Sequence, residues 1–174
     1  MIERTAKTPE PIATKVKNLS RLLAAIIAIV VFISDQMTKA AVESSIPEHS
    51  VIPILPGFFS LIHAKNPGAA FGLFSDSPAP WKTAVLIVIS GLLLLTVAGI
   101  VWRSRRLDWR ASVGMALILG GALSNLVDRI RLGRVVDFLD VYYRSYHWPT
   151  FNLADSAIVV GAGFLILQVI ISSD

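Results

Sequence analysis

Four long apolar segments limit the possible folds of this chain more than any other feature of its sequence. They cover residues 22–42, 81–102, 112–127 and 153–171. A helix needs about 20 mostly apolar residues to cross a hydrocarbon core of roughly 30 Å. Residues 22–33 alone resemble the apolar part of a signal peptide, but no convincing cleavage site follows them. The segments therefore predict an all-α integral membrane protein with four transmembrane helices.

The composition supports this class and excludes several others. Hydrophobic residues make up 54% of the chain and charged residues 16%, whereas soluble domains have about 25% charged residues. The net charge of +4 could indicate nucleic acid, but the basic residues lie in loops beside apolar segments, which favours membrane lipid as the partner. There is no Cys, and the three His have no metal-ligand spacing. We therefore expect no nucleic acid, no metal and no other cofactor.

The connections between the apolar segments differ in character. Residues 46–80 are rich in Pro and Gly and contain short β-prone pieces at 50–55 and 58–63, which predicts a small extramembrane β-sheet inserted between the first two helices. Residues 1–20 are polar and basic and are expected to form a mobile tail before a single domain over 21–174. The connection over residues 129–150 is interpreted as a short basic loop.

The distribution of basic residues predicts the orientation. The tail carries five of them up to Arg21, and the short connection between the second and third segments carries four. Cytoplasmic loops are enriched in Lys and Arg. Both termini are therefore expected to be cytoplasmic.

Polar side chains at the ends of the segments are expected to lie in one layer at one membrane surface. With four spans, the end of the first, the end of the third and the start of the fourth reach the same side. The residues concerned are Asp35, Asn66, Asn125, Asp128, Asp137, Asn152 and Asp155. An ionisable group near hydrocarbon is costly, so this layer is a hypothesis of a functional site.

Some of these residues also have a purely structural interpretation. Asp35 and Lys39 are spaced i, i+4 and could pair along one helix. Asn152, with an acidic residue three positions on, is typical of a helix N-cap. Asp128 beside Arg129 could form an ion pair, and Asp140 is interpreted as a solvated loop charge.

Small residues spaced by four indicate where helices pack closely, because they let backbones approach each other in lipid. Such pairs occur at Gly120 and Ser124, Gly121 and Asn125, and Ala157 and Gly161.

Two neighbouring carboxyl groups can act together as a general acid and a general base. Both cannot ionise cheaply, so one keeps a proton near neutral pH. The ionised group can take a proton from water while the protonated group donates to a carbonyl oxygen, which is peptide hydrolysis without a metal. The spacing does not decide which two Asp residues form the pair.

Five short motifs in this chain resemble those of the lipoprotein signal peptidases, the type II signal peptidases of bacteria. They are DQMTK at 35–39, NPGAAF at 66–71, GGALSNLVDR at 120–129, VVDF at 135–138 and FNLAD at 151–155. The resemblance implies an aspartyl endopeptidase of the bacterial cytoplasmic membrane, with its site near the extracytoplasmic face. Its substrates would be diacylglyceryl-modified prolipoproteins, cut just before the lipidated Cys. We expect a monomer, although no sequence feature determines the oligomeric state.

The resemblance also implies roles for individual residues. The catalytic positions fall on Asp137 and Asp155. The residues expected to bind substrate or support the site are Asp35, Lys39, Asn66, Gly68, Asn125, Asp128, Arg129 and Asn152.

A small transporter or channel and a membrane scaffold without chemistry are the alternative functions. A pore needs polar residues through its full depth, and the second and fourth apolar segments have almost none in their middles.

Overall fold

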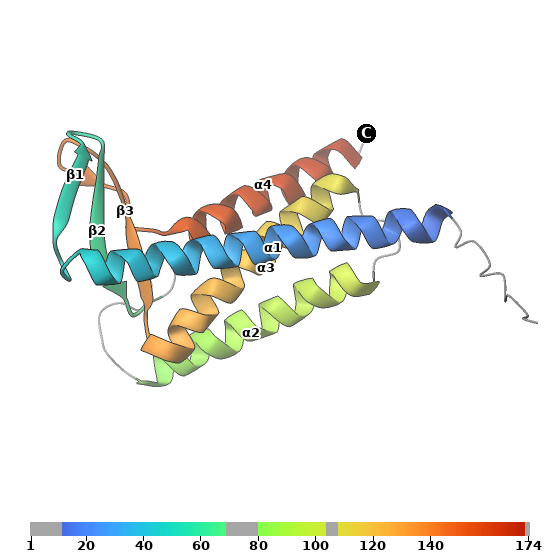
Figure 1. Ribbon diagram of the computed structural model, residues 1–174, viewed down its shortest axis with the longest axis horizontal. Helices are drawn as coiled ribbons and strands as arrows, with labels where there is room; N and C mark the ends of the chain where they lie inside the picture. Colours follow the sequence, from blue (N-terminus) through green and yellow to red (C-terminus); the bar gives the residue numbers. More distant parts are fainter. Residues whose placement is uncertain (1–11, 69–79, 104–107, 173–174) are drawn as a thin grey trace, which may run out of the picture.

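A computed structural model of the chain describes residues 12–68, 80–103 and 108–172. Its helices are α1 (Ile12–Ser45), α2 (Pro80–Arg103), α3 (Trp109–Leu132) and α4 (Leu153–Ser172). Its strands are β1 (Val51–Leu55), β2 (Phe59–Asn66), β3 (Val135–Tyr143) and β4 (Tyr146–His147). Figure 1 shows the sheet at one end of the helical bundle.

The described helices confirm the predicted membrane class. Four of them are long and apolar enough to cross a membrane, over Arg21–Ser45, Trp81–Arg103, Trp109–Leu132 and Leu153–Ile171. Large apolar side chains on α2 and α4 are exposed, as expected for surfaces that face lipid rather than water.

The first helix is longer than the sequence pattern predicted. It begins at Ile12, ten residues before the predicted start of the span, so the tail expected over residues 1–20 is helical from Ile12 onward. The physical reason is local, because residues 12–21 contain no Gly or Pro that would interrupt a helix before the apolar run. Residues 1–11 lie outside the described part of the chain.

The predicted sheet is present, but it also contains strands from a second connection of the chain. β1 and β2 come from the connection between α1 and α2, whereas β3 and β4 come from the connection between α3 and α4. The strands form one antiparallel sheet in the order β1-β2-β3-β4, and Ala64 pairs with Asp137 across β2 and β3. The prediction of a loop over 129–150 is therefore wrong for β3, whose β-branched and aromatic residues favour a strand.

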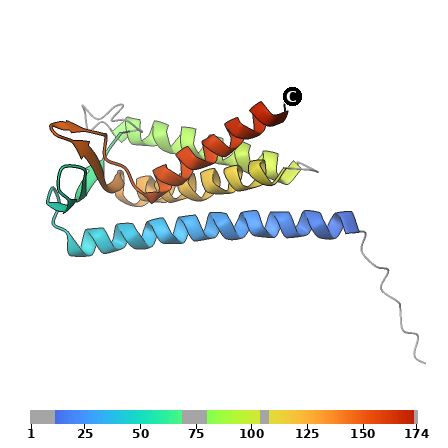
Figure 2. The ribbon, with the colours of Figure 1, turned by 90° about the horizontal axis from the view of Figure 1, so that it is seen from above.

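Helix α3 lies at the centre of the bundle and contacts each of the other helices (Figures 1 and 2). Adjacent glycines make this possible. A Cβ on Gly120 would collide with the backbone of Ala28 in α1, and a Cβ on Gly121 would collide with the carbonyl of Ala154 in α4. Gly161 of α4 approaches Gly114 just as closely. The close packing predicted at Gly120, Gly121 and Gly161 is confirmed.

The helices are joined to the sheet by a turn of the chain and by apolar packing. Helix α3 ends at Leu132, and its cap residue Gly133, with a φ of 71°, turns the chain into β3. Val42 in the last turn of α1 and Ile46 just after that helix pack against Val136 and Phe138 of β3. The sheet is thus fixed to the end of the bundle where the apolar segments carry their polar residues.

Candidate active site

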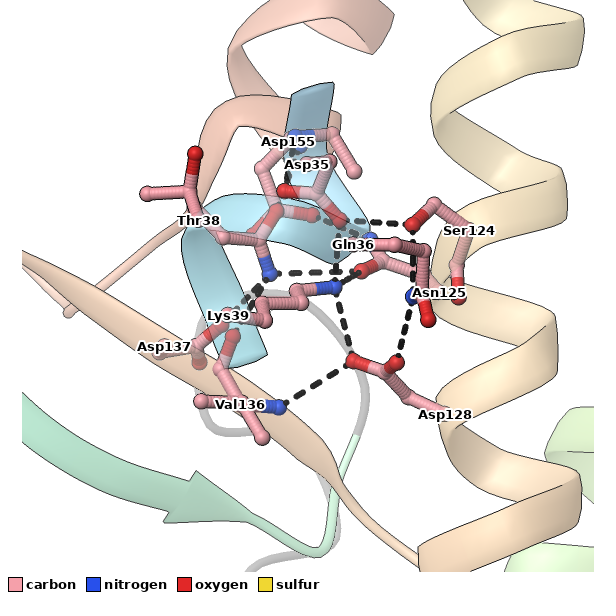
Figure 3. Close-up of polar contacts among 12 residues, drawn as sticks. Asp35, Gln36, Thr38, Lys39, Ser124, Asn125, Asp128, Val136, Asp137 and Asp155 are labelled. Carbon is pink, nitrogen blue, oxygen red and sulfur yellow. Dashed lines mark hydrogen bonds and ion pairs between the residues drawn. The ribbon is translucent and has the colours of Figure 1, made fainter. Parts of the chain in front are cut away.

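Polar side chains from separate elements meet where the bundle joins the sheet (Figure 3). Helix α1 contributes Asp35 and Lys39, α3 contributes Asn125 and Asp128, β3 contributes Asp137, and the start of α4 contributes Asn152 and Asp155. Asn66, at the end of β2, reaches the same place. The structure therefore brings together the residues that the span count predicted to share one layer.

Lys39 holds one half of this cluster. Its ammonium is buried and lies 2.7 Å from Asp35 Oδ2, 2.7 Å from Asp128 Oδ2 and 2.9 Å from Asn125 Oδ1. All three N–H donors of the ammonium thus have acceptors. A buried charge is tolerated when it is paired and hydrogen-bonded in this way. The predicted i, i+4 pair with Asp35 is confirmed.

The ion pair predicted between Asp128 and Arg129 is not formed in the described part of the chain, where Asp128 pairs with Lys39. Consecutive residues point about 100° apart around a helix, so they cannot face the same partner. Arg129 donates instead to two backbone carbonyls, those of Asn125 at 3.2 Å and Gly68 at 3.3 Å.

Asp137 and Asp155 are held by amides. Asp137 accepts from Asn152 Nδ2 at 2.8 Å and from Asn66 Nδ2 at 3.0 Å, and Asp155 accepts from Asn125 Nδ2 at 2.7 Å. Asn152 Nδ2 also donates to Asn125 Oδ1 at 3.2 Å, so the two amides link the two carboxyl groups. Among the described residues, no Lys or Arg forms an ion pair with either of them.

Burial changes the acidity of Asp137. Asp137 is only 1% exposed, and loss of solvation, together with the negative charge of Asp155, raises its pKa to about 7. The amide of Asn66, the charge of Lys39 and the amide of Asn152 act in the opposite direction. Asp155 is partly exposed. Near neutral pH, a proton is therefore retained on Asp137 for a substantial fraction of the time.

The sequence of the chain matches the family model described as signal peptidase (SPase) II over residues 27–171. The chain belongs to the signal peptidase II family. It is a peptidase, and so a hydrolase, with several membrane spans.

Individual relatives agree with this assignment. The lipoprotein signal peptidase of Solibacter usitatus (strain Ellin6076) is 44% identical over 83% of this chain and 88% of the relative. The lipoprotein signal peptidase of Syntrophus aciditrophicus (strain SB) is 42% identical over 86% of this chain and 92% of the relative. A bacterial membrane enzyme structure, solved by the in meso method at 2.3 Å, has 28% identity and a TM-score of 0.79, covering 87% of this chain and 90% of that one.

In this member of the signal peptidase II family, Asn152 is both a helix N-cap and a member of the polar cluster, the two interpretations that the sequence left open. Its Oδ1 accepts the backbone N–H of Asp155 at 2.8 Å, which is the predicted N-cap. Its Nδ2 meanwhile donates to Asp137 and to the carbonyl of Val136. One buried side chain therefore caps α4 and also binds the carboxyl group of β3.

The loop before α2 reaches this polar cluster through Gly68. The N–H of Gly68 donates to Asn66 Oδ1 at 2.9 Å, which leaves Asn66 Nδ2 directed at Asp137. Arg129 binds the carbonyl of the same glycine. The remaining residues of the NPGAAF motif, 69–71, and the rest of the predicted β region up to residue 79, lie outside the described residues.

Asp140 departs from the sequence interpretation. It was expected to be a solvated loop charge, but it lies in β3, is 4% exposed and binds His147 Nδ1 at 2.9 Å. Side chains three positions apart on a strand point to opposite faces. Asp140 therefore lies across the sheet from Asp137 and outside the candidate site.

Gln36 and Ser124 contact the site although neither was predicted from the sequence to be a site residue. Gln36 Nε2 donates to Ser124 Oγ at 2.9 Å and to Asp128 Oδ1 at 2.8 Å, and Ser124 Oγ donates to Asp35 Oδ2 at 2.7 Å. Ser124 had been interpreted as a small packing residue. A signal was present in its i, i+4 spacing to Asp128, which places both on one face of α3.

The described residues contain no group of three His, Cys, Asp or Glu side chains arranged to hold a metal ion. The expectation of a metal-free site stays a prediction.

Proposed function

We propose that this chain removes the signal peptide from diacylglyceryl-modified bacterial prolipoproteins, with Asp137 and Asp155 as a catalytic pair that activates water. The observation that carries this proposal is that the four carboxyl groups of the cluster have two different kinds of partner. Asp35 and Asp128 both form ion pairs with Lys39, whereas Asp137 and Asp155 receive only amide hydrogen bonds among the described contacts. Asp35 and Asp128 are engaged in these ion pairs, so Asp137 and Asp155 are the carboxyl groups available as acid and base.

The proposed reaction follows from one proton shared by the pair. The ionised carboxylate takes a proton from a water molecule as its oxygen attacks the scissile carbonyl carbon. The protonated carboxyl group donates its proton to the carbonyl oxygen, which gives a tetrahedral diol. The diol then collapses: one of its hydroxyl groups returns a proton to the carboxylate that had donated one, the C–N bond breaks, and the proton taken from water passes to the departing amine of the lipidated Cys. The pair returns to its singly protonated state.

The neighbouring residues have supporting roles in this proposal. Asn125 and Asn152 hold the two carboxyl groups at a fixed separation through their shared hydrogen bond. Asn66 and Arg129, both partly exposed at the site, would donate to the backbone of the substrate, and Gly68 would let the substrate approach the loop closely. Lys39 would hold Asp35 and Asp128 in ion pairs and so away from the reaction.

The position of the site suits a lipidated substrate. A signal peptide is a membrane helix, and each buried CH₂ of a diacylglyceryl group adds roughly 0.8 kcal/mol of anchoring. The scissile bond would then be held at the depth of Asp137 and Asp155 before any direct contact forms, which favours reaction by proximity. We further propose a monomer in the cytoplasmic membrane, with both termini cytoplasmic and the site near the extracytoplasmic face.

Cleavage of matched precursors by the purified full-length protein tests this function. One precursor peptide carries the diacylglyceryl group on its Cys and the other does not, and mass spectrometry identifies the bond that is cut. We expect cleavage just before the lipidated Cys, at least about tenfold slower turnover of the unlipidated peptide, and no effect of a chelator. Equal turnover of both peptides would contradict the role of lipid anchoring. Loss of activity with the chelator would contradict the metal-free mechanism.

A further inference from the structure

Asp35 and Asp128 each bind the backbone next to one member of the proposed catalytic pair. Asp35 Oδ1 accepts the N–H of Ala154 at 2.9 Å, and Ala154 directly precedes Asp155. Asp128 Oδ2 accepts the N–H of Val136 at 3.3 Å, and Val136 directly precedes Asp137. The two contacts come from different helices yet have the same relation to the site.

Both amides depend on these carboxylates because the surrounding protein excludes water. Ala154 and Val136 are each 0% exposed. A buried N–H without an acceptor costs roughly 1–3 kcal/mol. Ala154 also lies in the first turn of α4, where the N–H groups lack partners within the helix and a negative charge is favourable. The position of Asp35 therefore constrains where Asp155 can lie, and the position of Asp128 constrains where Asp137 can lie.

A closed ring of polar contacts fixes the orientation of both carboxylates (Figure 3). Lys39 Nζ joins Asp35 to Asp128 on one side. On the other side, Ser124 Oγ donates to Asp35 Oδ2, and Gln36 Nε2 joins Ser124 Oγ to Asp128 Oδ1. We call these five residues, Asp35, Gln36, Lys39, Ser124 and Asp128, the polar ring. The ring binds Oδ2 of Asp35, which leaves Oδ1 directed at the N–H of Ala154. It binds both oxygens of Asp128, and Oδ2 accepts from Lys39 and from the N–H of Val136 together.

We propose that Gln36 and Ser124 are positioning residues of the peptidase. Ser124 holds Asp35 against Ala154 and so sets the position of Asp155, while Gln36 holds Asp128 against Val136 and so sets the position of Asp137. This inference rests on the proposed function of that pair. Neither residue touches the pair in any described contact, so both act through the ring. A misplacement of about 1 Å in a reacting group can reduce the rate roughly 100-fold, so loosening the ring should slow catalysis.

Two variants separate the two sides of the ring. Ser124→Ala removes the hydroxyl that binds Asp35, and Gln36→Leu removes the amide that binds Asp128. Thr38→Val is a matched control because it also removes a polar group from α1, and that hydroxyl binds the carbonyl of Ser34 within the helix itself. Gln36 is only partly buried, so its substitution opens no core cavity, and Gln36→Leu alone decides the outcome if Ser124→Ala does not fold.

Hydrogen exchange of single amides tests the link without any substrate. In Ser124→Ala we expect exchange at Ala154 to become about tenfold faster, as for the loss of one buried hydrogen bond, while Val136 stays protected. In Gln36→Leu we expect the reverse selectivity, and in Thr38→Val neither amide changes. Unchanged exchange at both amides in the two ring variants would overturn the proposal.

Turnover of the diacylglyceryl-modified precursor gives the second readout. We expect kcat to fall roughly 10- to 100-fold in both ring variants, with KM within about threefold of the unmodified enzyme and the control unaffected. A rise in KM with kcat unchanged would indicate substrate binding and overturn the positioning role, as would unchanged kcat. Asp137→Asn is measured alongside. Cleavage by that variant would remove the proposed function itself, whereas normal turnover of the ring variants beside an inactive Asp137→Asn would remove only the role of the ring.

Discussion

Replacement of Asp137 by Asn should inactivate the enzyme and yet stabilise its fold in a way that depends on pH. The ordinary pKa of 3.8 rises to about 7 in the folded protein because Asp137 is buried beside Asp155. Between about pH 4 and pH 7 the folded protein keeps a proton that the unfolded chain has released, so stability falls as the pH rises through this window. The Asn side chain removes that dependence because it does not ionise.

The size of the effect follows from the same values. Each pKa unit corresponds to about 1.36 kcal/mol, so at pH 8 the folded state carries a penalty of roughly 4 kcal/mol. At pH 5 the penalty is roughly 1.5–2 kcal/mol. Asn has one acceptor oxygen, whereas Asp137 accepts from both Asn66 and Asn152, so the variant also loses a hydrogen bond worth about 1 kcal/mol at either pH. That loss cancels in the comparison between pH values.

The assay is unfolding of the unmodified protein and of Asp137→Asn at pH 5 and pH 8 in the same detergent. The stability difference between the two proteins should change by about 2–3 kcal/mol in favour of the variant at pH 8, or roughly 5–10 °C in melting temperature. A difference that is the same at both pH values would refute the raised pKa of Asp137 and the paired, desolvated site from which it was reasoned.

Three further substitutions, with one control, test other parts of the structure. Lys39→Met should destabilise the protein by roughly 3–5 kcal/mol in equilibrium unfolding, because it leaves two buried carboxylates without their shared cation. Asn66→Ala removes an amide that lowers the pKa of Asp137, so the titration of that carboxyl, followed in the pH–rate profile, should move to higher pH. Gly121→Ala should cost about 1–3 kcal/mol because its Cβ would meet a carbonyl of α4. Gly163→Ala, where no atom lies within 4 Å, should change stability by no more than about 1 kcal/mol.

The layer of polar residues could be predicted from the sequence because a membrane fixes depth. Once the apolar segments are counted, the ends of α1 and α3 and the start of α4 must lie on one side, which brings Asp35, Asn125 and Asp155 together. Helical spacing then predicts contacts within one element, such as that of Asp35 with Lys39. The capping role of Asn152 follows from the same local reasoning.

Contacts between elements could not be predicted in this way. Spacing within α3 placed Asp128 beside Arg129, but the acceptor for Lys39 is decided by how closely α1 packs against Gly120. Asp140 was misjudged because the chain after α3 was interpreted as a loop. In a strand that is buried on both faces, alternation sends Asp137 to the site and Asp140 to the opposite face.

The most direct test of the central claim is single-turnover cleavage of the diacylglyceryl-modified precursor by Asp137→Asn, Asp155→Asn and the double variant. Asp140→Asn is the matched control, since it changes a buried Asp of the same strand outside the site. Each single variant should fold and should lose roughly 10²–10⁴-fold in rate, the double variant should be no slower than the singles because the pair acts as one unit, and the control should stay active. Cleavage at a near-normal rate by either folded single variant would contradict the assignment of Asp137 and Asp155 as the pair that activates water.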